Sequence, residues 1–365
     1  MKVVVIGGGY AGLACLARLA RVVPDAERHL VDPGRWHLRR TQLHETLRRP
    51  LAELRADFAP IARRWDFRHH RARVAWSAAQ LAEWSRLRRI RIGKRALEFD
   101  ALVVTTGLPG VAGRASRSPT PPVPLETLAT GAGVNALRRL AATEGRAWVV
   151  GAGASGLQCL FELAAARPDG APLGLIEADD TLLPAEPAGL RRAVVGHLQA
   201  LDVELRTGML YEGFGRGRVR MRGREGVVSE PAGGALLCTG PTSQRIAADA
   251  AGRVLRGGRP LPAIFAAGDC ARWDGVPFDA ATAQTAVRKG RHVAATIASL
   301  AQGREPESWD ARQLGFFLSL GPRDAVGWLF ARQALITGLP AVAAREAAQA
   351  RWDLLLRGVD SFAAF

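Results

Sequence analysis

Two glycine-rich turns, one at the start of the chain and one near its middle, constrain the fold more than any other feature. The first is Gly7-Gly8-Gly9-Tyr10-Ala11-Gly12 and the second is Gly151-Ala152-Gly153-Ala154-Ser155-Gly156. Each follows a short apolar run and precedes an alanine- and leucine-rich stretch with helical spacing. In such a turn the first glycine permits the tight reversal, the second lets the backbone approach a pyrophosphate, and the third lets the helix pack closely on the strand. The pair of turns predicts two separate dinucleotide sites.

The residues around each turn predict a parallel βαβ unit. Strands are expected at residues 3–6 and 148–150, helices at 13–23 and 157–166, and second strands at 30–32 and 173–177. Asp32 lies 20 residues after Gly12 and Glu177 lies 21 after Gly156, the distance at which a carboxylate reaches a ribose hydroxyl pair. Any βαβ unit can carry a glycine at its turn and an acid on its next strand, but this alternative explains one site more easily than two. The predicted fold class is α/β, with two Rossmann-like dinucleotide-binding domains and a C-terminal helical or interface tail.

Two further segments resemble motifs of the flavoprotein reductases that bind two dinucleotides. One is residues 102–107, Leu-Val-Val-Thr-Thr-Gly, and the other is residues 261–271, which contain Ala267-Gly268-Asp269. In that family the aspartate of the second motif binds the ribityl chain of the flavin. The helix predicted at 282–300 would point its positive end at the pyrimidine edge of the flavin ring. The resemblance extends to residues 236–241, and it implies FAD at the first turn and NAD(P)H at the second.

The resemblance assigns residues to both sites. The implied FAD contacts are Gly7, Gly8, Gly9, Tyr10, Ala11, Gly12, Asp32, Arg40, Val74, Thr106, Gly107, Gly268, Asp269, Ala283 and Gln284. The implied contacts of the nicotinamide nucleotide are Gly151, Gly153, Ala154, Ser155, Gly156, Glu177 and Gly240. A 2′-phosphate would meet like charge at Glu177, so NADH is favoured over NADPH.

Within this superfamily the chain is most similar to the type II NADH:quinone oxidoreductases. The similarity covers residues 32–45, which end in Leu-His-Glu, and residues 283–290, which resemble the Ala-Gln-x-Ala segment beside the flavin and the quinone mouth. Residues 318–327 and 336–341 are similar to the membrane-facing C-terminal part of that family. The resemblance implies an enzyme that takes hydride from NADH onto FAD and passes electrons to an acceptor, a quinone near Gln284.

One departure from the family concerns the second fingerprint helix. Many members carry a glutamate two residues after the last glycine, close to where nicotinamide meets flavin, and this chain has Gln158 there. Glu162 lies four residues further on, on the same helical face one turn away, and matches a second acidic position often seen in the family. Gln158 and Glu162 are the candidate catalytic residues. A neutral amide cannot act as a carboxylate, so the efficiency of NADH oxidation and the identity of the acceptor stay open.

Motif order predicts three parts of the chain. A discontinuous FAD domain is expected at 1–117 and 242–308, an NAD(P)H domain at 118–241, and a tail at 309–365, with the proline-rich residues 119–124 as a stiff link. The tail is aromatic and aliphatic, with six arginines and five acids. Such a pattern fits helices in a membrane interface, the contact of a homodimer, or a lid on the flavin domain.

Composition and charge limit which other kinds of protein and partner are compatible with the chain. At 365 residues and 48% hydrophobic content the chain can bury two α/β cores. The net charge of +16 comes without a recognisable nucleic-acid module, so no nucleic-acid partner is expected. Two interpretations of the positive charge stay open: an arginine-rich solvated surface, and attraction to an anionic membrane. Neither a spanning segment nor a signal peptide is expected, which predicts a cytoplasmic protein, peripheral on the inner face of the cytoplasmic membrane if the tail binds lipid.

The cysteines separate this chain from the disulfide-relay reductases. Cys15, Cys159, Cys238 and Cys270 include no Cys-x-x-Cys pair, so no two close thiols are expected beside the flavin. Cys15 and Cys159 lie in the two fingerprint helices and are interpreted as small core residues, in keeping with a reducing cytosol. His69 and His70 have no further ligand pattern, and no metal site is predicted. Two other functions stay open: a soluble FAD reductase for another protein or small-molecule acceptor, and a flavin-bearing partner or sensor subunit with weak nicotinamide use.

Overall fold

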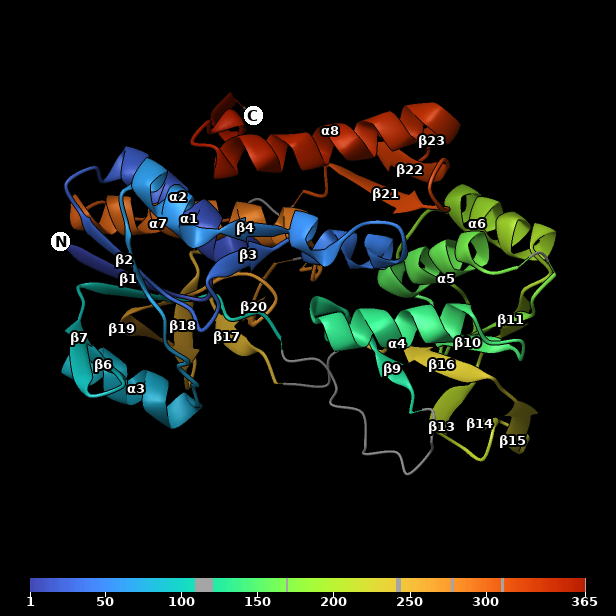
Figure 1. Ribbon diagram of the computed structural model, residues 1–365. Helices are drawn as coiled ribbons and strands as arrows, with labels where there is room; N and C mark the ends of the chain where they lie inside the picture. Colours follow the sequence, from blue (N-terminus) through green and yellow to red (C-terminus); the bar gives the residue numbers. More distant parts are fainter. Residues whose placement is uncertain (109–120, 169, 241–243, 277–278, 310–311, 365) are drawn as a thin grey trace.

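The computed structural model describes residues 1–108, 121–168, 170–240, 244–276, 279–309 and 312–364. Two sheet-and-helix units lie side by side, and a C-terminal tail crosses over both of them (Figure 1). The α/β class with two Rossmann-like units is confirmed.

The first unit is built on an eight-stranded sheet. Its order is β20-β17-β18-β19-β8-β1-β2-β5, and its strands are β1 (Lys2–Ile6), β2 (Glu27–Val31), β5 (Arg68–His70), β8 (Ala101–Val104), β17 (Ile246–Ala248), β18 (Arg253–Arg256), β19 (Arg259–Ala266) and β20 (Ala271–Trp273). Strand β1 lies between β2 and β8 and is parallel to both. Because it is covered on both faces, Val3, Val4 and Val5 are completely buried. The chain after residue 240 returns to this sheet through β17–β20, as expected for a discontinuous unit.

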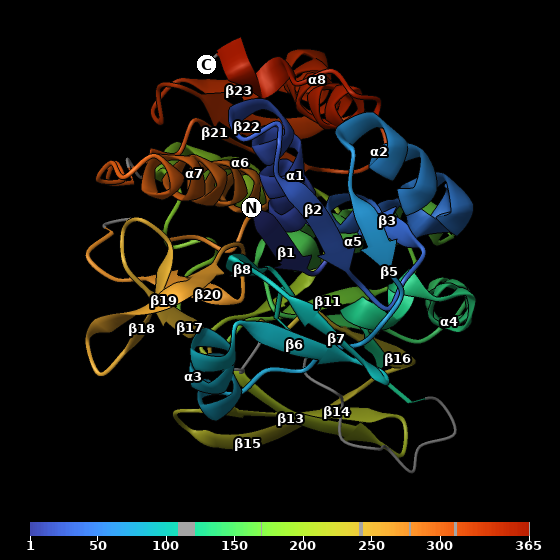
Figure 2. The same ribbon diagram turned by 90° about the vertical axis from the view of Figure 1, so that its left-hand side faces the viewer.

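Helices cover both faces of this sheet (Figure 2). Helices α1 (Tyr10–Val22) and α7 (Ala283–Ala301) lie side by side on one face, and α3 (Ala78–Leu87) packs against β19 on the other. A side chain at Gly290 of α7 would collide with the Ala11 carbonyl of α1, so a glycine permits this close crossing. The unit also holds α2 (Phe58–Trp65), the 3₁₀ segments Arg40–Leu47 and Leu51–Leu54, the pair β3 (Trp36–Leu38) and β4 (Arg55–Asp57), and the hairpin β6 (Arg89–Ile92) and β7 (Arg95–Glu98).

The second unit repeats the parallel pattern on a smaller scale. Its sheet has the order β12-β11-β10-β16-β9 and consists of β9 (Val123–Pro124), β10 (Ala147–Val150), β11 (Leu173–Ile176), β12 (Glu204–Arg206) and β16 (Gly234–Leu237). The helical segments are α4 (Gly131–Ala141), α5 (Ala154–Ala166), α6 (Ala188–Ala200) and the 3₁₀ turn Leu125–Ala129. An antiparallel sheet of β13 (Leu210–Gly215), β14 (Arg218–Gly223) and β15 (Gly226–Pro231) precedes β16 and buries Val219 and Met221 against Trp148.

The predicted domain boundaries can be compared with these sheets only in part. Residues 119 and 120 of the expected proline link lie outside the described residues. Val123 and Pro124 form the edge strand β9, which pairs with Leu236 and Leu237 of β16. The end of the link therefore belongs to the second sheet. The division at 117/118 and 241/242 stays a prediction.

The tail contains a sheet as well as a helix. Strands β21 (Gly315–Ser319), β22 (Ala325–Leu329) and β23 (Leu335–Thr337) form an antiparallel sheet, followed by α8 (Gly338–Leu356) and the 3₁₀ turn Ser361–Ala364. Leu318 and Trp328 join the core of the second unit, whereas Trp352, Leu355 and Leu356 join that of the first. Much of the apolar content of the tail is therefore used to hold the two units together. Within the described ranges, no helix is both long and apolar enough to cross a bilayer.

Candidate nucleotide-binding sites

The two acids predicted to bind ribose hold their glycine turns in the same way. The Gly8 amide donates to Asp32 Oδ2 at 2.7 Å, and the Ala152 amide donates to Glu177 Oε2 at 2.5 Å. The second oxygen of Asp32 accepts from the Gly34 amide at 2.7 Å, and that of Glu177 from the Asp179 amide at 3.0 Å. Each carboxylate is thereby fixed at the end of its strand, beside the turn.

The first and third glycines of each turn are required by the backbone. Gly7 has φ of +106° and Gly151 has φ of +97°, conformations that favour glycine. A Cβ at Gly12 would collide with the Gly7 carbonyl, and one at Gly156 would collide with the Gly151 carbonyl. The turns are therefore as tight as the sequence pattern predicts.

The middle glycines leave the starts of both helices open. Gly9 is the N-cap of α1 and Gly153 is the N-cap of α5, and neither helix start has a capping side chain or an acid in its first turn. Nothing lies within 4 Å of the positions where their side chains would be. The amide groups of residues 10–12 and 154–156 are thus free to bind an anion. Two such starts, each with a carboxylate 2.5 to 2.7 Å from the turn, fit two dinucleotides.

Aromatic side chains surround the first turn. His37 Nδ1 lies 3.0 Å from the Gly8 carbonyl, and the indole of Trp352 in α8 donates to His37 Nε2 at 3.1 Å. Tyr10 packs on Trp352 with ring centroids 4.7 Å apart, and its hydroxyl bonds to Thr41 at 2.8 Å. Burial lowers the pKa of His37 to about 4, so the ring is neutral, with a proton on Nδ1 that it donates to Gly8. Sequence reasoning did not assign His37 or Trp352 to the site.

Charged groups gather where the flavin ring is expected. Burial raises the pKa of Asp269, while Arg245, Arg40 and Lys289 oppose that rise. Arg245 donates to the Asp269 carbonyl at 3.0 Å and to Asp279 at 3.1 Å, and the buried Lys289 pairs with the same Asp279. Arg40 is exposed and close enough to act on Asp269, so the two predicted residues from distant segments lie in one region.

The start of α7 also reaches the tail. Thr282 caps the helix by accepting from the Thr285 amide at 3.2 Å. Gln284, one of the predicted contacts, accepts from the Leu314 amide at 3.3 Å. The helix end expected at the flavin is thereby tied to the segment that leads into β21.

The remaining predicted FAD residues follow the ends of parallel strands. Thr106 is exposed after β8 and accepts from the Trp76 indole at 3.1 Å. Gly107 and Gly268 have φ of +67° and +76°, and a Cβ at Gly268 would lie 3.0 Å from that of Ala11. Val74 is half-buried against the first core, and Ala283 opens α7. The role of each in binding stays a prediction.

The second turn opens onto a cavity of about 240 Å³. Its lining combines predicted and new residues: Ala152, Gly153, Ala154, Glu177, Asp179, Leu183, Pro184, Ala185, Glu186 and Phe316. Phe316 comes from the tail, and Glu186 accepts from the buried indole of Trp328 in the tail at 2.8 Å. Gly240, also predicted, is exposed beyond β16. The tail thus contributes to both sites, which its apolar pattern alone did not reveal.

The two candidate catalytic residues of α5 have different surroundings. Gln158 is half-buried in the second turn of the helix. Glu162 is buried and accepts from Arg48 Nε, which is 3.1 Å from both of its carboxylate oxygens. Glu162 therefore faces the C-terminal end of the 3₁₀ segment Arg40–Leu47, where Arg48 lies. It has no hydrogen bond to the nucleotide turn among those of the described residues.

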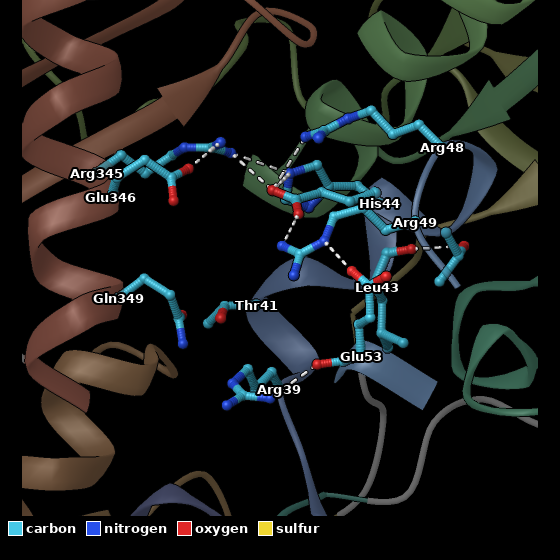
Figure 3. A network of polar contacts seen from close by, with 12 residues as sticks. Arg39, Thr41, Leu43, His44, Arg48, Arg49, Glu53, Arg345, Glu346 and Gln349 are labelled. Atoms are coloured by element: carbon cyan, nitrogen blue, oxygen red, sulfur yellow. Dashed lines mark hydrogen bonds and ion pairs between the residues drawn. The ribbon is translucent and has the colours of Figure 1, made fainter. Parts of the chain in front are cut away.

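Arg48 belongs to a charge cluster, defined here as His44, Glu45, Arg48, Arg49, Glu162 and Arg345. Its two carboxylates and His44 are buried, and His44 and the three arginines are labelled in Figure 3. Glu45 is paired with Arg49 at 2.8 Å, Arg48 at 3.2 Å and Arg345 of α8 at 3.3 Å. Burial alone would raise the pKa of Glu45, but its bond from Arg49 and the neighbouring charges lower it below its usual value. Burial raises the pKa of Glu162 against the effect of Arg48. The cluster joins both units and the tail, and removing one partner would leave a buried charge uncompensated.

Two cysteines far apart in the sequence lie together beneath the second turn. Cys159 of α5 and Cys238, which follows β16, lie close enough for the Cys159 thiol to raise the pKa of Cys238. The sequence predicts no two close thiols beside the flavin and a core position for Cys159. Cys159 does pack in the core of the second unit, and the pair lies at the second turn. Sequence spacing could not reveal the pair, because 79 residues and three strands of another sheet separate its members.

Comparison with known proteins agrees with this geometry. The family model for pyridine nucleotide-disulphide oxidoreductases matches residues 1–290. The sulfide:quinone oxidoreductase of Aquifex aeolicus is 15% identical, with 99% of this chain and 93% of that chain covered and a TM-score of 0.80. NDH2 from Plasmodium falciparum, in complex with NADH, is 10% identical, with 98% and 96% covered and a TM-score of 0.76. The NAD-dependent persulfide reductase of A. fulgidus is 21% identical, with 90% and 63% covered and a TM-score of 0.67.

The family match covers both glycine turns, the Asp269 motif and the first part of α7. FAD and NAD(P)H are the cofactors, and their expected positions are the two uncapped helix starts. The chain belongs to the pyridine nucleotide-disulphide oxidoreductase family and is an FAD-dependent NAD(P)H oxidoreductase.

Proposed function

We propose that this protein is an NADH:quinone oxidoreductase that works at the inner face of the cytoplasmic membrane. NADH would bind at the second turn and FAD at the first, with the acceptor near Gln284. When bound, FAD supplies the ability to accept two electrons from the nicotinamide and to pass them on.

The observation that carries the quinone proposal is the tail. Two of the compared proteins, from A. aeolicus and P. falciparum, have names that point to a quinone or NADH dehydrogenase role. They are matched over 93% and 96% of their lengths, and the match includes the tail of this chain. The persulfide reductase and the putidaredoxin reductase complex are matched over 63% and 81% of theirs, with 90% of this chain covered. A tail shared with the first two supports an acceptor that binds beside it.

The protein groups around Gln284 support the same position for the acceptor. Its amide oxygen binds the Leu314 amide, so the start of α7 and the tail are joined. Thr282 caps α7, and Lys289 and Arg245 are held by Asp279 behind Asp269. These groups orient the bound ring and provide positive potential where negative charge develops on reduction.

The second site supports NADH as the electron donor. Glu177 and Asp179 both line the cavity, and Glu177 keeps a carboxylate beside the turn through the Ala152 amide. A 2′-phosphate placed there would meet two negative charges.

The membrane location rests on exposed apolar side chains. Among the described residues, eleven large hydrophobic side chains are exposed, and five of them, Leu329, Phe330, Leu339, Leu354 and Val359, lie in the tail. Phe330 is 75% exposed and Leu339 is 74% exposed. Together with the +16 charge of the chain, they support binding to an anionic lipid surface.

The acceptor is tested by mixing the purified holoprotein with NADH without oxygen and then adding acceptors. We expect loss of the oxidised flavin absorbance on mixing, and its rapid return when a short-chain quinone is added. Failure of NADH to reduce the flavin would contradict the whole proposal and favour a partner or sensor role. Return with other acceptors only would contradict the quinone.

A reductase for a protein acceptor is the second candidate. It is favoured by the charge of +16, which would attract an acidic partner, and the putidaredoxin reductase–putidaredoxin complex is among the similar structures, with a TM-score of 0.66. An acidic iron–sulfur protein is therefore included in the acceptor series. Faster flavin reoxidation by that protein than by quinone would establish this candidate instead.

Membrane binding is tested separately with anionic phospholipid vesicles. We expect the protein to sediment with them, and Phe330→Ser with Leu339→Ser to reduce the bound fraction. Leu210→Ser is the matched control, because Leu210 is 59% exposed on β13 of the second unit. Equal binding of both variants would contradict a membrane-facing tail.

A further inference from the structure

We propose that Cys159 and Cys238 form a reversible disulfide that weakens nucleotide binding at the second glycine turn. The inference concerns the NAD(P)H site alone and does not depend on the acceptor. Neither thiol belongs to the residues assigned to nucleotide or electron transfer.

The two cysteines lie within bonding reach because of how α5 crosses the end of β16. The Cys238 amide donates to the Val150 carbonyl at 2.7 Å, which fixes the residue beside the turn. Its Cβ lies 3.2 Å from the position that a Cβ at Gly156 would occupy. Cys159 follows Gly156 by three residues, on the same helical face, and its thiol lies close enough to that of Cys238 to raise the pKa of Cys238. Cys159 is buried, whereas Cys238 is half-buried.

The first unit has the same two positions with different chemistry. Cys15 follows Gly12 by three residues, as Cys159 follows Gly156. Thr105 follows β8 and its amide donates to the Ile6 carbonyl at 2.8 Å, as Cys238 does to Val150. The Thr105 hydroxyl bonds to the Ile6 and Gly7 carbonyls at 3.0 and 2.8 Å. A disulfide can therefore form in the second unit and not in the first.

Hydrogen peroxide or another small peroxide is the oxidant by class. The Cys238 thiolate attacks one peroxide oxygen and breaks the O–O bond, which gives a sulfenic acid and, after protonation, water. The Cys159 sulfur then attacks the Cys238 sulfur and displaces the second oxygen as water. In sum, two thiols and one peroxide give one disulfide and two waters. A small dithiol restores both thiols by exchange.

Formation of the bond would disturb the nucleotide turn because Cys238 packs directly beside it. A disulfide holds its two sulfur atoms about 2.0 Å apart, closer than two thiols in van der Waals contact, so the bond would draw α5 and Cys238 together. The Cys238 carbonyl already lies 2.7 Å from the position of a Cβ at Gly151. A shift there moves the turn and the uncapped start of α5, where the pyrophosphate is expected.

The Cys238 thiol is protonated at neutral pH. The neighbouring Cys159 thiol and burial raise the pKa of Cys238 above its usual value, and the nearby charge of Glu126 adds to this effect. Because the thiolate is the attacking species, oxidation should speed up as the pH rises. The pair would therefore respond to sustained oxidant rather than to brief exposure.

The test combines thiol counting with nucleotide binding on the FAD-loaded protein. After peroxide treatment and alkylation under denaturing conditions, we expect two of the four thiols to be protected in the wild-type chain and a Cys159–Cys238 peptide in its digest. We expect the Kd for NAD⁺ to rise about tenfold and to return after treatment with a dithiol. FAD content serves as the check that each protein remains folded.

Matched variants identify the residues responsible. Cys238→Thr copies the residue that the first unit carries, and Cys159→Ser removes the other thiol; in both, peroxide should leave the Kd for NAD⁺ unchanged. Cys15→Ser should behave like the wild-type chain. Four reactive thiols after peroxide treatment, or an equal Kd for the oxidised and reduced wild-type protein, would overturn the proposal.

Discussion

The two nucleotide sites share a backbone but differ in what surrounds it. In both, an acid on the second strand binds the amide of the turn, at Gly8 in the first site and at Ala152 in the second. A Cβ at Gly8 would collide with the ring of Phe58, whereas Ala152 accommodates its methyl group in the second core. The first turn is packed against a second layer of the protein, and the second turn faces a cavity.

With FAD at the first turn and NADH at the second, as proposed above, this difference would separate a cofactor that stays bound from one that leaves. His37, Tyr10 and Trp352 close over the first turn and connect it to α8, so release of FAD would require the tail to separate from the unit. The second turn is bordered by Glu177, Asp179 and Phe316 around open space, as exchange of NADH in every turnover requires. The same local motif thus serves two purposes, which are decided by distant residues.

The largest expected effects come from the third glycine of each turn. Gly12→Ala places a methyl group against the Gly7 carbonyl, and Gly156→Ala against that of Gly151. We expect Gly12→Ala to yield protein with little FAD, and Gly156→Ala to retain FAD but to bind NAD⁺ at least about 100-fold more weakly. Flavin absorbance and calorimetry with NAD⁺ measure the two effects.

Gly9→Ala and Gly153→Ala are the controls for this comparison. Both face open space in the structure, so thermal unfolding of the nucleotide-free protein should be unchanged. Only the affinity for the matching dinucleotide should fall, since the added methyl meets the pyrophosphate. If Gly153→Ala instead released FAD, the assignment of one nucleotide to each turn would be wrong.

The local half of this architecture could be predicted from the sequence. The run of Val3 to Ile6 and the acid at Asp32 depend on neighbours within one βαβ unit, and β1, α1 and β2 follow them closely. The sequence likewise predicts the helix over residues 282–300, and in the structure Thr282 caps a helix that spans Ala283–Ala301. Period and turn chemistry are sufficient where contacts are close in sequence.

The contacts that distinguish the two sites join residues that are distant in sequence, and no sequence pattern predicts them. His37 and Trp352 are 315 residues apart, and Glu186 and Trp328 are 142 apart. The apolar pattern of the tail fits a membrane interface, a homodimer contact or a lid on the flavin domain, and its Trp328 and Trp352 are buried within the chain. Helical spacing places Glu162 on the same face as Gln158, and its partner Arg48 comes from the other unit; its catalytic role stays a prediction. Tertiary packing decided each case.

Acid should weaken the first site more than the second. The pKa of His37 falls from 6.5 in the unfolded chain to about 4 in its buried position. Between these values the unfolded state binds the extra proton, so stability is lost as the pH falls from 6.5 toward 4. The loss should reach about 2 kcal/mol at pH 5, measured by denaturant unfolding followed through FAD release.

His37→Asn tests the origin of that acid sensitivity. The amide can still donate to Gly8 in place of Nδ1, although it is too short to accept from Trp352 in place of Nε2. It does not titrate, so the decline below pH 6.5 should become shallower. His197→Asn in α6 of the second unit should leave the decline unchanged. An identical pH profile in His37→Asn would assign the effect elsewhere, with the buried His44, whose pKa is also lowered by burial to about 4, as the next residue to replace.

Two tryptophans of the tail allow the sites to be weakened one at a time. Trp352→Phe removes the indole N–H that binds His37 together with part of the buried ring, and Trp328→Phe makes the same change at the indole that binds Glu186. An unpaired buried acceptor costs about 1–3 kcal/mol. We expect Trp352→Phe to release FAD faster with unchanged NAD⁺ affinity, and Trp328→Phe to lower NAD⁺ affinity with unchanged FAD release. If each variant weakened both sites equally, the tail would be a common lid and the two sites would not be independent.

The smallest effect concerns the choice between NADH and NADPH at Glu177. Glu177→Gln can keep the bond from the Ala152 amide but loses the charge that a 2′-phosphate would meet. We expect the ratio of kcat/KM for NADPH to that for NADH to rise about tenfold, equivalent to about 1.4 kcal/mol. Asp180→Asn is the matched control, because Asp180 is exposed beside the same strand and pairs with Arg224 at 2.8 Å. An equal shift in both variants would mean that general surface charge, and not the fixed carboxylate of the second site, selects the nucleotide. The two carboxylates would then differ in role as well as in surroundings. Asp32 would lie beside a cofactor that stays bound, and Glu177 would have no part in the choice between NADH and NADPH.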